Sequence, residues 1–257
     1  YHKWKIILDT STKNAADAPE IFSDLLILCT GSYPIISPLP VTHLENVSLD
    51  TALKPSLLSC TLPKCSKVVV AVIGASHSAV LVLRNLHSLA CSSHPSLRIK
   101  WFARHPVRYA EEKDGWILYD NTGLKGEAAV WARENLEESK LRISDVAKYL
   151  DRVATTPTRE DEIYNIHLPS CTHIIQAIGF RPRQIPNIEK DGKRLDLKFN
   201  HDSQAFEEDG KLIRGLYGAG IAWPERVTDP EGNVSLDVGM WKFMRSAKKA
   251  ATKWHEA

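Results

Sequence analysis

The chain has 257 residues, of which 43% are hydrophobic and 25% are charged. These proportions are those of an ordinary globular protein, and the length is sufficient for one large or two small domains. The formal net charge of +2 gives no basic field that would indicate a nucleic-acid or anionic membrane partner. The longest apolar run, Val68–Leu83, is broken by glycine, serine and histidine and is too short to span a bilayer.

Two apolar segments predict the first strands. Trp4–Leu8 reads as a strand, and Leu25–Cys29 reads as a buried strand that stops at Thr30-Gly31. Parallel strands buried on both faces give such continuous apolar runs, and a glycine lets the chain leave the sheet beside a bound nucleotide. The following segment, Pro34–Pro63, is rich in prolines and is predicted to be a linker.

The cysteines allow two interpretations. Cys60 and Cys65 have the C-x4-C spacing of a redox dithiol, but they directly precede a predicted strand, where incidental linker thiols are also expected. The chain has five cysteines, an odd number without dense spacing, which favours a reducing compartment and therefore a cytoplasmic location. The sequence contains no close C-x2-C pair, and we expect no metal site.

The stretch Lys67–Ala90 predicts a buried strand, a tight turn and an apolar helix. The turn has the sequence G-A-S-H-S-A, whose small residues let the helix pack close to the strand and point its free amides at a pyrophosphate. It departs from G-x-G-x-x-G at the second glycine, which is a serine here. The histidine suits either a phosphate contact or a solvent-facing position. The residues predicted to bind a dinucleotide are Gly74, Ser76, His77 and Ser78.

The next predicted strand, Leu97–Ala103, ends at two nearby arginines. Arg104 follows the strand directly, Arg108 lies four positions further on, and the first acid is Glu111. The end of the second strand of a Rossmann unit meets the adenosine ribose, where an arginine suits a 2′-phosphate and an acid suits a 2′-hydroxyl. We therefore expect NADPH rather than NADH, the alternative being that both arginines are solvated surface cations.

The second half of the chain predicts a charged helical insertion and three later elements. Residues 126–152 alternate apolar and charged positions as a surface helix does. Ile174–Ile178 is an apolar strand that stops at Gly179. A glycine-rich strand and turn, Gly215–Ala222, precede a loop and a helix that begins near Leu236.

The order of these motifs resembles that of the two-dinucleotide-binding-domain flavoproteins, especially the flavin-containing and N-hydroxylating lysine/ornithine-type monooxygenases. Asp24–Gly31 resembles the A-T-G-type strand that closes an FAD domain, and Gly74–Ala79 resembles the NADPH turn. Ile175–Phe180 is similar to a second A-T-G-Y segment. The family's N-terminal FAD glycine turn does not precede Leu25, and Tyr1 is not an initiator methionine, so we expect a fragment with part of a flavin site.

The resemblance implies a doubly wound α/β protein that uses FAD and NADPH. Its NADPH domain would be 64–180, with the helical insertion 126–152, set into a partial FAD domain of 1–63 and 181–257. A monooxygenase-like oxidoreductase acting on a small molecule is expected, with a disulfide-type reductase or a non-catalytic dinucleotide-binding module as alternatives. No catalytic acid or base and no oligomeric state can be assigned. The expected flavin contacts are Gly31, Gly218 and Gly220, and Gly179 is a further residue expected to bind a cofactor.

Overall fold

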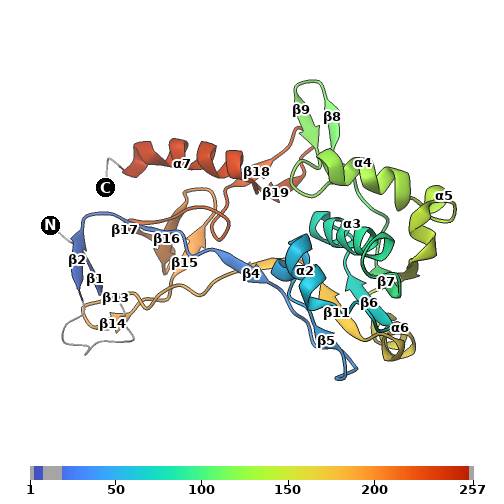
Figure 1. Ribbon diagram of the computed structural model, residues 1–257. Coiled ribbons are helices and arrows are strands. Elements are labelled where there is room, and N and C mark those ends of the chain that lie inside the picture. The colour runs from blue at the N-terminus through green and yellow to red at the C-terminus, as the bar shows by residue number, and fades with distance from the viewer. Residues whose placement is uncertain (1–2, 8–18, 255–257) are drawn as a thin grey trace. The chain divides into compact units, whose positions relative to one another are not determined.

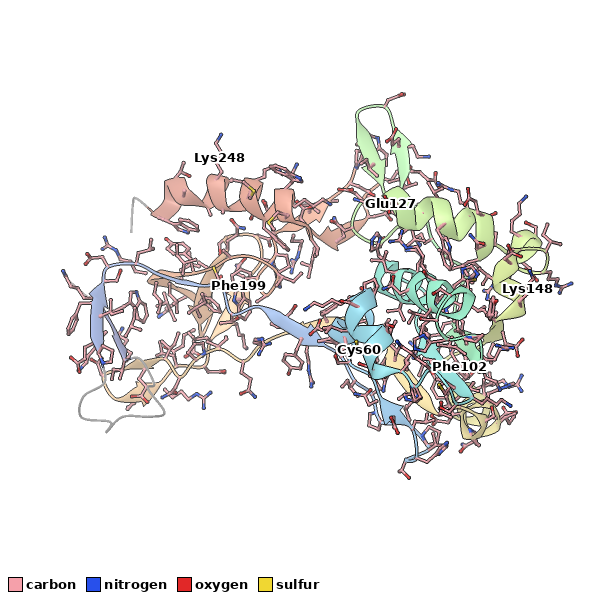
Figure 2. The ribbon with its side chains drawn as sticks, in the orientation of Figure 1. Cys60, Phe102, Glu127, Lys148, Phe199 and Lys248 are labelled. Carbon is pink, nitrogen blue, oxygen red and sulfur yellow. The ribbon has the colours of Figure 1, made fainter. Side chains whose placement is uncertain are left out.

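The computed structural model describes residues 3–7 and 19–254 (Figure 1). The chain forms two compact units: unit 1 comprises Tyr1–Tyr33 and Arg181–Ala257, and unit 2 comprises Pro34–Phe180. The chain leaves unit 1 in β4 (Ser32–Pro34) and returns in β12 (Phe180–Pro182), and these strands form a two-stranded sheet. Phe102, labelled in Figure 2, belongs to a core cluster of unit 2, and Phe199, also labelled there, packs against the core cluster of unit 1.

Unit 2 is built on a five-stranded parallel sheet, which confirms the predicted α/β class. The sheet order is β10-β7-β6-β11-β5. The chain runs outward from β6 through β7 to β10 and then crosses to the other side of β6 to form β11. Two neighbouring connections therefore leave the sheet in opposite directions, and ligands bind at such a switch point. The strands are β5 (Glu45–Asn46), β6 (Val68–Ile73), β7 (Leu97–Ala103), β10 (Leu150–Ala154) and β11 (His173–Gln176).

Both faces of the sheet are covered, because all six residues of β6 are buried. Val68, Val70 and Val72 pack in the cluster that contains the apolar face of α3, whereas Val69 and Ala71 pack in a second cluster with residues of α6 and η3. The alternation follows from the two-residue period of a strand. The helices are α1 (Leu49–Ala52), α2 (Pro55–Thr61), α3 (His77–Cys91), α4 (Gly126–Asn135), α5 (Glu138–Leu141), η2 (Asp145–Lys148), α6 (Glu160–His167) and η3 (Leu168–Ser170).

Two parts of unit 2 differ from the sequence prediction. Residues 34–63, expected to be a linker, supply β5, α1 and α2, and the buried Asn85 side chain of α3 donates to the Ala52 carbonyl (3.0 Å). The unit boundary accordingly lies at 33/34 rather than 63/64. The predicted helical insertion contains α4 and α5, but its last residues begin β10, which extends the sheet beside β7. A short hairpin, β8 (Glu111–Lys113) and β9 (Trp116–Leu118), precedes α4.

Unit 1 holds a four-stranded sheet of order β15-β16-β17-β3, in which only the β17–β3 pair is parallel among the described residues. Its core contains Phe206, Leu216 and Trp223, and the partly buried Phe199 packs against them. The predicted C-terminal helix begins at Met240 because Leu236 ends a strand. The elements are β1 (Trp4–Ile7), β2 (Glu20–Ser23), β3 (Leu26–Leu28), β13 (Glu189–Lys190), β14 (Lys193–Arg194), β15 (Lys198–Asn200), β16 (Ala205–Glu208), β17 (Lys211–Gly218), β18 (Arg226–Thr228), β19 (Val234–Leu236) and α7 (Met240–Trp254). Leu8, the predicted end of the first strand, lies outside the described residues.

Within the described part of the chain, every helix is too short or too polar to cross a membrane.

Candidate functional site

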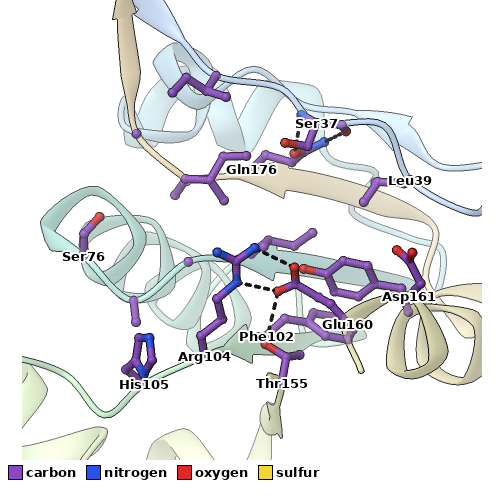
Figure 3. Close-up of a pocket in the computed structure, with 18 of the residues that line it drawn as sticks. Ser37, Leu39, Ser76, Phe102, Arg104, His105, Thr155, Glu160, Asp161 and Gln176 are labelled. Carbon is purple, nitrogen blue, oxygen red and sulfur yellow. Dashed lines mark hydrogen bonds and ion pairs between the residues drawn. The ribbon is translucent and has the colours of Figure 1, made fainter. Parts of the chain in front are cut away.

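A pocket of about 740 Å³ opens in unit 2 at the C-terminal ends of its central strands (Figure 3). Its lining includes Ile73 and Gly74 at the end of β6, Phe102 and Arg104 at the end of β7, and Gln176 at the end of β11. This is the switch point of the sheet, and the volume falls in the range of ordinary small-molecule sites. The fold alone therefore brings residues from distant parts of the sequence to one cavity.

Gly74 is required by the tight turn between β6 and α3. Its φ is +129°, and a Cβ at this position would lie 2.3 Å from the carbonyl oxygen of Ala177. The Gly74 amide donates to the Phe102 carbonyl (3.0 Å), and the indole N–H of Trp101 donates to the Gly74 carbonyl (2.7 Å). The turn thus lies directly against the end of β11, and both the amide and the carbonyl of Gly74 are hydrogen-bonded to residues of β7.

The N-terminus of α3 faces this turn without a side-chain cap. Ser76 is the N-cap residue, its hydroxyl makes no capping hydrogen bond, and the Val80 amide donates to the Ser76 carbonyl (3.1 Å). The amides of a first helical turn have no acceptor within the helix, and together with the helix dipole they favour an anion. Ser76 lines the pocket, and its binding of a dinucleotide stays a prediction.

His77 and Ser78 lie in the first turn of α3 but outside the pocket lining. Burial lowers the pKa of His77, and the positive charges of Lys125 and Arg84 lower it further. The imidazole is therefore mainly neutral at pH 7 and offers at most a neutral hydrogen bond. The phosphate contact of His77 stays a prediction.

Arg104 and Arg108 both line the pocket. Arg104 donates from Nε to Oε1 of Glu160 (2.8 Å) and from Nη2 to Oε2 (2.6 Å), so its guanidinium forms a two-point ion pair. The Arg108 guanidinium lies 4.7 Å from the centre of the Tyr119 ring. The sequence analysis predicts that Arg104 and Arg108 bind a 2′-phosphate. The structure shows both side chains at the pocket and pairs Arg104 with Glu160.

Gln176 fixes the chain segment that forms another wall of the pocket. Its side-chain oxygen accepts from the Ser37 amide (2.9 Å), and its side-chain nitrogen donates to the Ser37 carbonyl (3.0 Å). Gln176 is buried, and Ile35, Ser37, Pro38 and Leu39 belong to the pocket lining. One amide side chain thus satisfies both polar backbone groups of a residue in an otherwise irregular segment.

Replacing Gln176 with alanine is expected to destabilise unit 2 by about 1–3 kcal/mol, because the Ser37 amide and carbonyl lose their partners. Amide hydrogen exchange in 35–39 should increase more than exchange in β6. Asn165→Ala provides a control, since its side chain donates to one carbonyl on the exposed surface of α6 (2.8 Å). Equal exchange changes in both variants would show that Gln176 does not hold this wall.

The predicted flavin glycines all lie in unit 1. Gly179, predicted to bind a cofactor, lines the pocket of unit 2. Gly31 follows β3, and Gly218 ends β17; because these strands are parallel neighbours, Gly31, Gly218 and Gly220 lie near the same edge of the unit 1 sheet. The Thr30 hydroxyl at this edge is buried without a hydrogen-bond partner.

Gly218 and Gly220 have different structural reasons to be glycine. A Cβ on Gly218 would lie 2.6 Å from the Phe199 ring and 2.7 Å from the Trp223 side chain, so close core packing accounts for it. Gly220 has a φ of +78°, and a Cβ there would meet no atom within 4 Å. Open space therefore lies beside Gly220, whereas the core side chains pack closely against Gly218.

The cysteines and other candidate ligands form no cluster at the pocket. Cys60 and Cys65 are exposed free thiols, and neither belongs to the pocket lining. Residues 3–7 and 19–254 contain no group of three or more histidine, cysteine, aspartate or glutamate side chains that could hold a metal ion.

Sequence reasoning missed the acidic side of the pocket. Thr155, which follows β10, and Glu160 and Asp161 at the start of α6 line it (Figure 3). Tyr164 further along α6 lines it as well. The acidic run Glu160-Asp161-Glu162 is a typical helix start. The run indicates a helix N-terminus. Because the sequence pattern predicts a helical insertion up to residue 152, where β10 lies in the structure, it does not predict that this run lies at the edge of the sheet.

Comparisons with known proteins find a similar curated protein and a solved structure with a similar fold. The chain is 49% identical over 238 residues to a curated protein named monooxygenase AgnR1 from Paecilomyces divaricatus. The match covers 91% of this chain and 61% of that protein, so the chain spans about three fifths of the relative's length. No family model matches the sequence.

A solved structure of an NAD-dependent persulfide reductase from A. fulgidus matches 98% of this chain with a TM-score of 0.51. The chain covers 41% of that protein at 13% identity. The mixed α/β fold is Rossmann-like. At this level of identity the likeness concerns the fold, and the chemistry has to be argued from the site.

Proposed function

We propose that unit 2 binds NADPH and that the chain is part of an FAD-dependent oxidoreductase of the monooxygenase type. The observation that carries the proposal is the pocket at the switch point of the sheet, where the uncapped N-terminus of α3 and Arg104 line one cavity. The first offers amides to a pyrophosphate, and the second offers a guanidinium to a 2′-phosphate. The name of the 49% identical relative supports monooxygenation as the reaction class.

The residues of unit 1 fit part of a flavin site. Thr30 has a buried hydroxyl without a partner, and Gly220 leaves open space at the same sheet edge. Thr30, Gly31 and Gly220 would hold a portion of FAD, whereas Gly218 serves the packing against Phe199 and Trp223. When bound, FAD supplies hydride acceptance and the redox step with the final acceptor, and the protein orients the reactants and excludes water. A small molecule with a nucleophilic nitrogen, sulfur or carbon centre is the proposed substrate.

Replacing Arg104 with alanine is expected to weaken NADP⁺ binding by about tenfold or more, because a charge-assisted hydrogen bond contributes about 1.5–3 kcal/mol. NAD⁺ binding should change by less than about threefold, since it lacks the 2′-phosphate. Isothermal titration of both nucleotides measures the two affinities independently of any turnover.

Arg98→Ala is the matched control. Arg98 lies on the same strand as the residues before Arg104, and its guanidinium donates to the Pro95 and Leu97 carbonyls (3.0 and 2.7 Å) rather than lining the pocket. This variant should bind both nucleotides as the wild type does. An equal loss of NADP⁺ and NAD⁺ affinity in Arg104→Ala would reject the 2′-phosphate assignment.

A further inference from the structure

Glu160 holds a position in the pocket that the nucleotide-binding motifs do not explain. It is the first residue of α6, and its carboxylate receives both hydrogen bonds of the Arg104 ion pair. The Glu160 side chain is 16% exposed, whereas the Arg104 side chain is 55% exposed. Glu160 is thus the more buried partner of the pair, and Figure 3 shows the Arg104 guanidinium hydrogen-bonded to its carboxylate.

The surroundings of Glu160 keep its carboxylate ionised. The hydrogen bond from Arg104 lowers the pKa of Glu160, an effect that exceeds the opposing effect of burial, and hydrogen bonds from Tyr164 and Thr155 lower it further. The Thr155 hydroxyl lies 3.4 Å from Oε1. Asp161 adds a second carboxylate to the same side of the pocket. A bound ligand therefore meets the ionised carboxylate of Glu160 beside Arg104.

The ion pair uses two of the five N–H groups of the guanidinium and leaves three for a ligand. A 2′-phosphate that accepts from those three would lie about one guanidinium width from the Glu160 carboxylate, and like charges at such a separation repel each other. A ribose with a free 2′-hydroxyl has no such repulsion, because a hydroxyl donates to a carboxylate.

We propose that Glu160 determines nucleotide specificity by competing with the 2′-phosphate of NADPH for Arg104, so that the pocket discriminates only weakly between NADPH and NADH. The proposal rests on the proposed function of the pocket. Glu160 acts through Arg104 and touches no reacting atom. Its role is distinct from that of an acid at the end of the second strand, since it comes from the connection between β10 and α6.

The variant Glu160→Gln keeps the shape of the side chain and removes its charge. We expect NADP⁺ to bind roughly tenfold more tightly than to the wild type, since both the competing ion pair and the repulsion are lost. NAD⁺ affinity should stay unchanged or fall slightly. The ratio of the two affinities, measured by isothermal titration at fixed salt concentration, is the readout, because a general structural change would move both affinities together.

Glu162→Gln is the matched control. Glu162 lies on the same helix and forms the same two-point pair, with Nε and Nη2 of Arg159 (both 3.0 Å), but it does not line the pocket. If Glu160→Gln does not fold, Glu160→Asp takes its place. The shorter side chain withdraws from Arg104 by one methylene, and the ratio should again exceed that of Glu162→Gln.

An NADP⁺ to NAD⁺ affinity ratio that rises in the Glu160 variant and not in the Glu162 variant supports the proposal. A ratio that stays the same or falls overturns it, while leaving nucleotide binding by the pocket intact. If the wild-type chain binds neither nucleotide, the proposed function fails and the role of Glu160 fails with it.

Discussion

Replacing Gly74 with alanine is expected to destabilise unit 2 by about 3 kcal/mol or more and to abolish nucleotide binding. Two costs combine at this residue. A φ of +129° disfavours any side chain, and the new Cβ would lie 2.3 Å from the Ala177 carbonyl oxygen. The contacting atom is backbone at the end of the central sheet and cannot rotate away, so β11 or α3 has to move. Urea unfolding followed by circular dichroism measures the loss.

Gly115→Ala separates the two costs. Gly115 lies in the β8–β9 turn with a φ of +81°, and a Cβ there would meet no atom within 4 Å. This variant should lose only about 1–2 kcal/mol, which is the cost of the left-handed backbone alone. A Gly74 variant that is no less stable than the Gly115 variant would show that the turn does not pack against β11 as described.

The second large effect is expected at Trp101, whose side chain is fully buried in β7. Trp101→Ala should destabilise unit 2 by about 3–5 kcal/mol, because it removes a large aromatic ring from the core and leaves a cavity. It also removes the donor to the Gly74 carbonyl (2.7 Å), so the nucleotide turn should loosen as well. Urea unfolding gives the first effect, and hydrogen exchange at residues 74–79 gives the second.

Two further variants test the Trp101 prediction. Trp101→Phe keeps most of the ring and loses the N–H donor, so a loss of about 1–2 kcal/mol is expected, with the same loosening of the turn. Trp241→Ala changes the same residue type on the surface of α7, where the side chain is 80% exposed, and should shift stability by less than about 0.5 kcal/mol. Similar losses for Trp101→Ala and Trp241→Ala would contradict the burial of Trp101.

The parts of the fold that were predictable from the sequence are those with a strong local pattern. β6 is an unbroken apolar run followed by glycine, and β7 has the predicted bounds Leu97–Ala103 because polar residues flank it on both sides. The turn at Gly74 was recognisable because small residues interrupt an apolar stretch just where a helix begins. Local hydrophobic periodicity and turn chemistry suffice for such elements.

The parts that were not predictable depend on partners distant in the sequence. β5 has two residues and β10 has five, and neither carries a continuous apolar pattern; pairing with β11 and β7 makes them strands. Glu160 lies 56 positions after Arg104. Their contact arises only because β10 lies beside β7. The sequence pattern predicts a helix where β10 begins, and for this reason the acidic side of the pocket was not predicted.

The central claim is that NADPH binds at the switch point of the unit 2 sheet, and an NMR titration of the ¹⁵N-labelled chain with NADP⁺ tests it most directly. We predict saturable shifts of the amides of residues 75–79 at the start of α3 and of residues 104–108 after β7. Shifts that do not saturate, or that are confined to unit 1, would contradict the claim.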